Sequence, residues 1–151
     1  MAAAASYAFE RTRLVRFAHC DAAGIIFFPQ YLVLINDLVE DWLGEGLGVP
    51  NAELILRRRI GTPTVSLQCD FHAVSHLGDR ITLGLSVERV GAKSFTLRHG
   101  CRAGGELRMS ARQVLVFTDL DTHGSIEIPQ DLRRALHRFT PPSFTPPEDT
   151  P

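Results

Sequence analysis

One long apolar segment with helical spacing limits what this chain can fold into. Within residues 30–46, large apolar side chains recur every three to four positions: Tyr31, Leu34, Ile35, Leu38, Val39 and Trp42. This spacing predicts a helix, and Leu32 and Val33 widen its apolar face, so we expect the helix to be largely buried. Three glycines and a proline predict its end: Gly44, Gly46, Gly48 and Pro50.

Strand patterns dominate the rest of the chain. A first strand is expected over residues 7–17, and four more runs follow the helix: Thr62–Phe71, Arg80–Val90, Ser94–Ala103 and Glu106–Phe117. The second of these four has the clearest alternation of apolar and polar residues, as in a half-buried antiparallel strand. Gly104 and Gly105 predict a hairpin turn. A change in alternation near Arg112 and Gln113 predicts a bulge, and a short terminal helix is expected over residues 129–139.

A single buried helix followed by antiparallel strands indicates an α+β arrangement, with the sheet wrapped around the helix. The chain of 151 residues is long enough for one sizeable core. We therefore expect a single domain over residues 1–140. Residues 141–151 are rich in proline and poor in apolar side chains, so we expect a disordered tail.

Charge and cysteine content exclude several classes of protein. A net charge of −1 and a pI near 6.6 give no electrostatic reason to expect nucleic acid or an anionic membrane as partner. The three cysteines form no CxxC pair, which favours a reducing compartment over a disulfide framework. No signal peptide or membrane-spanning run is evident, so we expect a cytoplasmic protein.

The segment from Phe17 to Tyr31 contains the candidate reactive group. Asp21 precedes three small residues that leave room for a substrate, and Gly24 among them can adopt left-handed dihedral angles. Pro29 suits the first position of the helix, which makes Phe28 the expected cap. N–H groups at a helix start have no partner within the helix and can face a developing oxyanion. By position alone, the simpler interpretation of Asp21 is a turn or cap residue.

Four sequence blocks carry a family resemblance: CDAAGIIFFPQY at Cys20–Tyr31, IGTPTVSLQCDF at Ile60–Phe71, KSF at Lys93–Phe95 and IEIP at Ile126–Pro129. In their order and approximate spacing they resemble the hotdog-fold acyl-CoA thioesterases, specifically the 4-hydroxybenzoyl-CoA thioesterase family. The resemblance implies a hotdog fold, in which an antiparallel sheet wraps around one long central helix. It also implies hydrolysis of an acyl-CoA thioester without a cofactor or metal, since coenzyme A is part of the substrate.

The resemblance assigns roles to individual residues. Asp21 is implied to attack the thioester as a nucleophile, giving a mixed anhydride, or to activate water as a general base. An ionised carboxylate suits either role better than that of a general acid. The backbone N–H of Phe28 is implied to polarise the carbonyl. The implied substrate contacts are Gly24, Asn36, Thr62, Lys93 and Ser94.

The chain departs from the family pattern at positions that bear on the substrate. Asn36 stands where the family has an aspartate that contacts the para-hydroxyl, and an amide cannot accept a proton from a phenol, which argues against a 4-hydroxybenzoyl group. Of the family's basic residues for the nucleotide phosphates, only Lys93 clearly remains. Gly91, Ala92 and Gly124 replace the others. Arg57–Arg59 are hypothetical substitutes, although such a run more often faces water.

Three functions are consistent with these sequence features. The first is a thioesterase for an aromatic or similar short acyl-CoA; the second is a thioesterase for short or medium aliphatic acyl groups. The third is a non-catalytic hotdog module that binds acyl-CoA or a partner protein. By the same resemblance, we expect a homodimer or homotetramer with sites at the dimer interface.

Other polar residues fit functional sites less well. His72 and His76 are four residues apart but fall at a strand end and in a loop, not on a helix, so no metal site is expected. His19, Cys20 and Asp21 are adjacent on an extended segment, where successive side chains point to opposite faces, so they do not predict a catalytic triad. His99 alternates with Leu97 and Cys101, which indicates a packed strand residue.

Overall fold

The computed structural model describes residues 6–141. Its main feature is a five-stranded antiparallel sheet in the order β1-β4-β5-β6-β3. In that order the strands are Phe9–Leu14, Arg80–Val90, Ser94–Ala103, Glu106–Val116 and Thr64–Phe71. Two short strands, β2 (Ile60–Gly61) and β7 (Thr118–Asp119), pair separately. The predicted tail, from residue 142 onward, lies outside the described residues.

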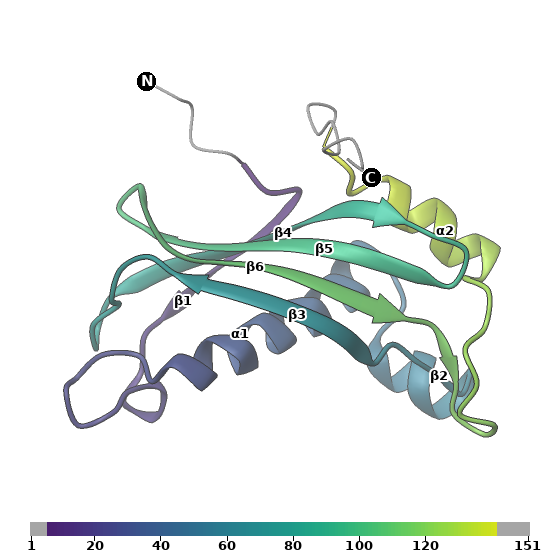
Figure 1. Cartoon of the computed structure of the whole chain (residues 1–151), viewed down its shortest axis with the longest axis horizontal. Helices are drawn as coiled ribbons and strands as arrows, with labels where there is room; N and C mark the ends of the chain where they lie inside the picture. Colours follow the sequence, from purple (N-terminus) through teal and green to yellow (C-terminus); the bar gives the residue numbers. More distant parts are fainter. Residues whose placement is uncertain (1–5, 142–151) are drawn as a thin grey trace, which may run out of the picture.

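The long helix α1 (Phe28–Asp41) lies along one face of the curved sheet (Figure 1). The expected hotdog arrangement is therefore confirmed. The shorter helix α2 (Gln130–His137) lies near the end of β4, at the opposite end of the molecule from the start of α1. A 3-10 turn covers Phe17–His19, and two π-helical turns cover Trp42–Gly46 and Glu53–Arg57. None of the described helices is both long enough and apolar enough to cross a membrane.

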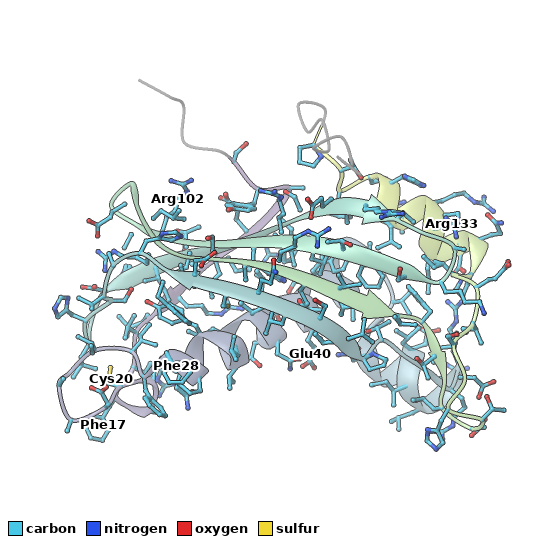
Figure 2. The ribbon with its side chains drawn as sticks, in the orientation of Figure 1. Phe17, Cys20, Phe28, Glu40, Arg102 and Arg133 are labelled. Carbon is cyan, nitrogen blue, oxygen red and sulfur yellow. The ribbon has the colours of Figure 1, made fainter. Side chains whose placement is uncertain are left out.

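One face of α1 forms the core with the sheet, and the other is open. Tyr31, Leu34, Ile35, Leu38 and Val39 are buried against strand residues such as Leu83, Leu85 and Leu97. The expectation of a largely buried helix holds for this face alone. The side chain of Val33 is 50% exposed, although the sequence placed it on the buried face. Asn36 and Glu40 are also exposed, and Glu40 lies on the side of α1 away from the sheet (Figure 2).

Both predicted ends of α1 need correction. The cap is Phe27, not Phe28, because Phe27 keeps extended dihedral angles of φ −68° and ψ 124°. Phe28 is consequently the first helical residue and Pro29 the second. At the other end, Gly44 does not stop the helical path. The chain continues as a π-helical turn to Gly46, where the closely packed Trp42 ring leaves no space for a Cβ atom.

The predicted bulge at Arg112 and Gln113 is wrong. Both residues pair in regular register, with Arg98 and Leu97 of β5. The polar Gln113 broke the sequence alternation because it is a buried residue of the helix-facing side. In the β5–β6 pair the register shifts instead between Cys101 and Arg102, where Arg108 is the extra residue on β6. In the β3–β6 pair it shifts between Thr64 and Ser66, where Val65 is the extra residue on β3.

The other strand predictions are largely confirmed. β4 and β5 have the predicted bounds, whereas β1 and β3 are shorter than expected. Gly104 and Gly105 form the β5–β6 hairpin turn with φ of 56° and 81°, the left-handed conformation that favours glycine.

Strand β3 lies at an edge of the sheet, with β6 as its one neighbour. Large apolar side chains on this strand are exposed: Val65 by 61%, Leu67 by 40% and Phe71 by 47%. An edge strand of eight residues with exposed apolar side chains is suited to pairing with another chain.

Candidate active site

Asp21 lies in a tight turn that its own carboxylate stabilises. Asp21 Oδ1 accepts a hydrogen bond from the Ala23 N–H at 2.8 Å, and the Gly24 N–H donates to the Asp21 carbonyl at 3.0 Å. Gly24 has φ 74°, so the predicted need for a left-handed residue is confirmed. The Asp21 side chain is exposed, and Oδ1 is the carboxylate oxygen committed to the turn.

Backbone pairing brings this turn to the start of α1. Cys20 and Ile26 form an antiparallel bridge, and the Phe27 N–H donates to the His19 carbonyl at 3.0 Å. Phe28 follows as the first helical residue, so its N–H has no acceptor inside the helix. Cys20 and Phe28 lie at the same end of the molecule (Figure 2). A carboxylate and the positive end of a helix are thus held on the two arms of one short loop.

An apolar pocket of about 450 Å³ adjoins the helix start. Its walls come from the loop, from α1, and from the end of β3 with the residues after it: Ile26, Phe28, Tyr31, Phe71, His72, Ala73, Val74 and Ser75. The Phe71 ring lies 6.0 Å from the Phe28 ring and 5.7 Å from the Tyr31 ring, measured between centroids. This aromatic wall suits a flat apolar group.

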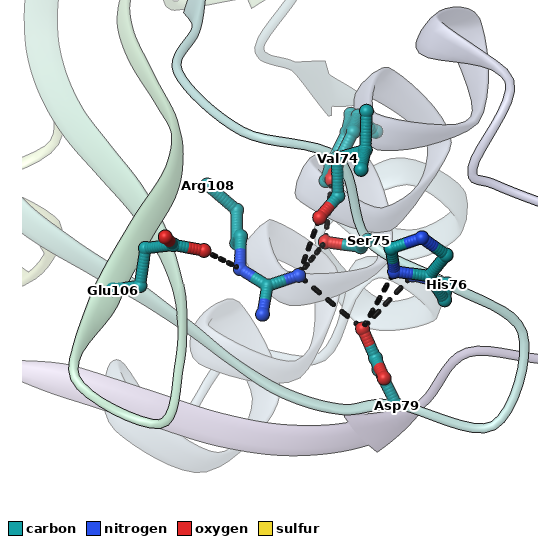
Figure 3. Close-up of polar contacts among 7 residues, drawn as sticks. Val74, Ser75, His76, Asp79, Glu106 and Arg108 are labelled. Atoms are coloured by element: carbon teal, nitrogen blue, oxygen red, sulfur yellow. Dashed lines mark hydrogen bonds and ion pairs between the residues drawn. The ribbon is translucent and has the colours of Figure 1, made fainter.

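A polar network behind the pocket ties its parts together (Figure 3). The buried Tyr31 hydroxyl donates to Ser75 Oγ at 2.8 Å. Arg108 Nη1 contacts Ser75 Oγ at 3.4 Å and Asp79 Oδ2 at 3.2 Å, and it donates to the Val74 carbonyl. The His76 backbone N–H and the Arg108 guanidinium hold the pKa of Asp79 below its ordinary value.

The loop that Arg108 holds is also the support of the Asp21 turn. The Ile26 N–H donates to the Ser75 carbonyl, and the Leu77 N–H donates to the Gly24 carbonyl, each at 2.9 Å. Sequence reasoning missed Arg108 and Ser75. The one signal was an arginine on a strand next to a hairpin, which normally indicates a solvated side chain.

A second pocket, of about 540 Å³, lies at the β4–β5 turn. It is cationic, with Arg89, Lys93 and Arg112 beside Ser94 and Thr96. Helix α2 fixes the turn, because Arg133 Nη2 donates to the Gly91 carbonyl at 2.9 Å and to the Ala92 carbonyl at 3.1 Å. Sequence reasoning singled out Lys93 and Ser94 but missed Arg89 and Arg112.

The two pockets lie at opposite ends of the sheet. Phe28 and Arg133 mark these ends in Figure 2. In strand register, Ser94 pairs with Val116 and Thr96 with Val114, level with the start of β3, whereas the apolar pocket lies at its end. Within one chain, Lys93 and Ser94 are therefore not brought together with Asp21.

The remaining predicted contacts lie apart from Asp21 as well. Asn36 is exposed on the outer face of α1, and Thr62 is half-buried between β2 and β3. Arg58 binds Asp131 through two hydrogen bonds, of 2.8 and 3.2 Å, and Arg59 Nε binds Asp121 at 3.1 Å. Two of the three arginines proposed as phosphate ligands are thus engaged in ion pairs.

Three histidines in the described part of the chain act as polar structural residues. His19 Nδ1 accepts a hydrogen bond from the Arg16 N–H, and His72 Nε2 lies 2.8 Å from Ser110 Oγ. His99 is buried, as predicted. Among residues 6–141, no three His, Cys, Asp or Glu side chains gather as metal ligands would.

Sequence comparisons relate this chain to known enzymes. The family model described as Thioesterase-like superfamily matches residues 15–136. A 4-hydroxybenzoyl-CoA thioesterase from Pseudomonas sp. strain CBS-3 is 27% identical over 125 residues, covering 78% of this chain and 89% of that protein. A 1,4-dihydroxy-2-naphthoyl-CoA hydrolase from Synechocystis sp. is 33% identical over 88 residues. That match covers 58% of this chain and 62% of that relative.

Solved structures give the same relationship. A gentisyl-coenzyme A thioesterase superposes with a TM-score of 0.77 and 30% sequence identity. The superposition covers 85% of this chain and 99% of that one. The likeness therefore extends over nearly the whole described fold.

Proposed function

This chain belongs to the thioesterase-like superfamily, and we propose that it hydrolyses the thioester of an aromatic or similar short acyl-CoA. The observation that carries this proposal is the short loop that has the Asp21 carboxylate on one arm and leads on the other into the helix start at Phe28, which lines an apolar pocket with an aromatic wall. The relatives named above act on aromatic CoA thioesters, which supports the same substrate class.

The proposed chemistry needs only these two groups and water. The carbonyl oxygen accepts a hydrogen bond from the Phe28 N–H, which stabilises the negative charge that develops on that oxygen. In one route the Asp21 carboxylate attacks the carbonyl carbon, the thiolate of coenzyme A leaves, and water then hydrolyses the mixed anhydride. In the other route Asp21 takes a proton from the water that attacks directly. Both yield the free acid and coenzyme A, and neither needs a cofactor.

The cationic pocket supplies a place for the nucleotide phosphates of coenzyme A. Arg89 and Lys93, which form no ion pair within the described residues, offer positive charge where Gly91 and Ala92 replace the family's basic residues. Arg112 adds a guanidinium group whose Nε is paired with Glu88 at 2.9 Å. Guanidinium groups bind phosphate with paired hydrogen bonds. We therefore assign the phosphates to this pocket and not to Arg57–Arg59.

A dimer makes one site from the two pockets. The pockets lie at opposite ends of β3, so antiparallel pairing of two β3 edges would bring the apolar pocket of one copy beside the cationic pocket of the other. The exposed apolar side chains of β3 favour such pairing. We propose a homodimer with two composite sites; two such dimers would form the expected homotetramer. The three cysteines are all unpaired, which suits the reducing cytoplasm.

Asn36 is proposed to meet the acyl group from the outer face of α1. Replacing Asn36 by Asp restores the carboxylate found in the family, so activity toward 4-hydroxybenzoyl-CoA should rise relative to benzoyl-CoA. The measurement is the ratio of kcat/KM for the two thioesters. An unchanged ratio would remove Asn36 from the substrate contacts.

The function is tested with a panel of purified acyl-CoA thioesters, following release of the free thiol. Benzoyl-type thioesters should be hydrolysed faster than butyryl-CoA and hexanoyl-CoA. Faster hydrolysis of the aliphatic thioesters would favour the aliphatic alternative. Binding of acyl-CoA without thiol release from any member would favour the non-catalytic module.

A further inference from the structure

A chain of hydrogen bonds runs from the protein core to the open edge of the sheet. His99 Nε2 lies 2.7 Å from Gln113 Oε1, and Gln113 Nε2 donates to Thr64 Oγ1 at 2.7 Å. His99 is 2% exposed and Gln113 7%, whereas Thr64, the first residue of β3, is exposed. A buried polar chain is costly unless its members are paired, so its extension to a surface hydroxyl needs an explanation.

The donors and acceptors in this series of hydrogen bonds follow one order, from His99 to Thr64. Burial lowers the pKa of His99 to about 4, so its ring is neutral at pH 7 and carries one N–H. Gln113 accepts at Oε1, so this hydrogen must sit on Nε2. The buried Nδ1, which has no hydrogen-bond partner among the described residues, is then only an acceptor. If Gln113 instead donated to His99 Nε2, the ring hydrogen would lie on Nδ1. A buried N–H without a partner costs more free energy than a buried acceptor without one.

The direction determines what Thr64 offers at the edge. Gln113 donates to the Thr64 oxygen, so the Thr64 hydroxyl is free to donate its own hydrogen outward. Gln113 lies on the helix-facing side of the sheet with its pairing partners Leu67 and Leu97. Thr64 lies on the same side, because it pairs with Leu115, two residues from Gln113 on β6, across the register shift at Val65. Thr64 therefore presents a fixed donor on the side of the sheet that contains the apolar pocket.

Pairing of two β3 strands places this donor in the site of the second copy. An antiparallel pair of β3 strands centred on Gln68, with the bulged Val65 outside the ladder, sets Ser66 opposite Asp70 and Thr64 opposite Phe71 of the second copy. Directly opposite residues project to the same side of the sheet. In that copy the Phe71 ring lies against the Phe28 ring, and the Phe28 N–H is the group proposed to bind the thioester carbonyl.

We infer that Thr64 donates a hydrogen bond across the dimer to a ring hydroxyl next to the thioester carbonyl, which makes 2-hydroxyaroyl thioesters the preferred substrate class. This inference rests on the proposed function and deepens it. A 2-hydroxyl group can donate its own hydrogen to the adjacent carbonyl oxygen, which leaves its oxygen as an acceptor for Thr64. Thr64 lies near the carbonyl end of the acyl group, so it would contact this position and not a para-hydroxyl.

The first test compares kcat/KM for 2-hydroxybenzoyl-CoA and benzoyl-CoA. Thr64→Val should lower the ratio of the two values about tenfold, as expected for one hydrogen bond, and Thr64→Ser should keep it. Gln113→Glu should lower it too, because Thr64 would then donate to the carboxylate. Thr12→Val on the other edge strand is the matched control and should leave the ratio unchanged. An unchanged ratio in Thr64→Val, or an equal loss in Thr64→Ser, would overturn the inference.

The second test asks whether Thr64 acts across the dimer. Differently tagged Asp21→Asn and Thr64→Val chains, purified as a mixed dimer, contain one composite site with both groups intact. This dimer should hydrolyse both thioesters with the wild-type ratio. The lowered ratio of Thr64→Val in the mixed dimer would place Thr64 in the site of its own chain and refute the inference. Absence of thiol release from either thioester in the wild-type protein would instead count against the proposed function.

Discussion

The buried His99 couples the stability of this protein to pH. In an unfolded chain a histidine titrates near 6.5, whereas burial lowers the pKa of His99 to about 4 in the folded protein. Between these values the unfolded state binds more protons, so the free energy of unfolding falls as the pH falls, and above about 6.5 His99 has no such effect.

This linkage gives a prediction for His99→Gln, which keeps a donor for Gln113 but cannot titrate. Between pH 7 and pH 5 the wild-type protein should lose about 2 kcal/mol more unfolding free energy than the variant. Urea unfolding at the two pH values measures the difference. Equal losses of unfolding free energy in the wild-type protein and the variant would mean that His99 is not buried as described.

At the scale of single residues, the sequence could predict local backbone geometry but not which distant side chains form hydrogen bonds with one another. The small residues around Asp21 predicted the turn, and Gly24 adopts the expected left-handed angles. His99 was correctly placed in the core. Its bond to Gln113 joins residues 14 positions apart on neighbouring strands, so no local pattern contains it. The buried Gln113 even produced a false bulge, because a polar residue on the apolar face resembles a shift in register.

At the scale of elements, Arg108 holds the loop between β3 and β4 against the Asp21 turn and α1. Arg108→Met removes the contacts to Ser75, Val74 and Asp79. We expect kcat to fall on the order of tenfold with a smaller change in KM, because the carboxylate and the helix start lose their relative position.

Steady-state kinetics of Arg108→Met, with circular dichroism to check folding, tests this role. Arg108→Lys should recover part of kcat because it keeps a cation near Asp79. The exposed Arg134 on α2 provides the matched control, Arg134→Met. A folded Arg108→Met protein with wild-type kcat would exclude the positioning role.

The elements themselves were predicted better than their ends. The bounds of β4 and β5 were correct, because β4 alternates clearly and the Gly104–Gly105 turn marks the end of β5. The start of α1 was misplaced by one residue, since Pro29 is tolerated at either of the first two helical positions. Arg108 became the extra residue of β6 through its tertiary contacts, which the hairpin sequence does not encode locally.

At the scale of the whole molecule, the two pockets at opposite ends of β3 are the basis of the proposed dimer. Leu67→Glu places a charge near the middle of the exposed β3 edge, where two copies would meet close to the two-fold axis. Repulsion between the paired charges should convert the dimer to a monomer and abolish most thioesterase activity.

Sedimentation equilibrium, combined with thiol release at the same concentrations, measures both effects. Leu14→Glu on β1, the opposite edge strand, changes a similarly exposed leucine and should leave the dimer intact. A wild-type monomer with full activity would contradict the composite site.

The sequence could not indicate this arrangement from its own patterns, because strand order, and with it the free edge, depends on pairings between distant segments.

The central claim is that the Asp21 carboxylate carries the hydrolysis, with the Phe28 N–H as donor to the thioester carbonyl. The most direct test is the rate of thiol release from benzoyl-CoA by Asp21→Asn, a variant that keeps the side-chain size and an oxygen for the Ala23 N–H. Turnover should fall by at least about tenfold, since loss of a nucleophile or base typically costs two or more orders of magnitude. Glu127→Gln, which changes an exposed carboxylate elsewhere, should retain full turnover. Unchanged hydrolysis by a folded Asp21→Asn protein would contradict the account.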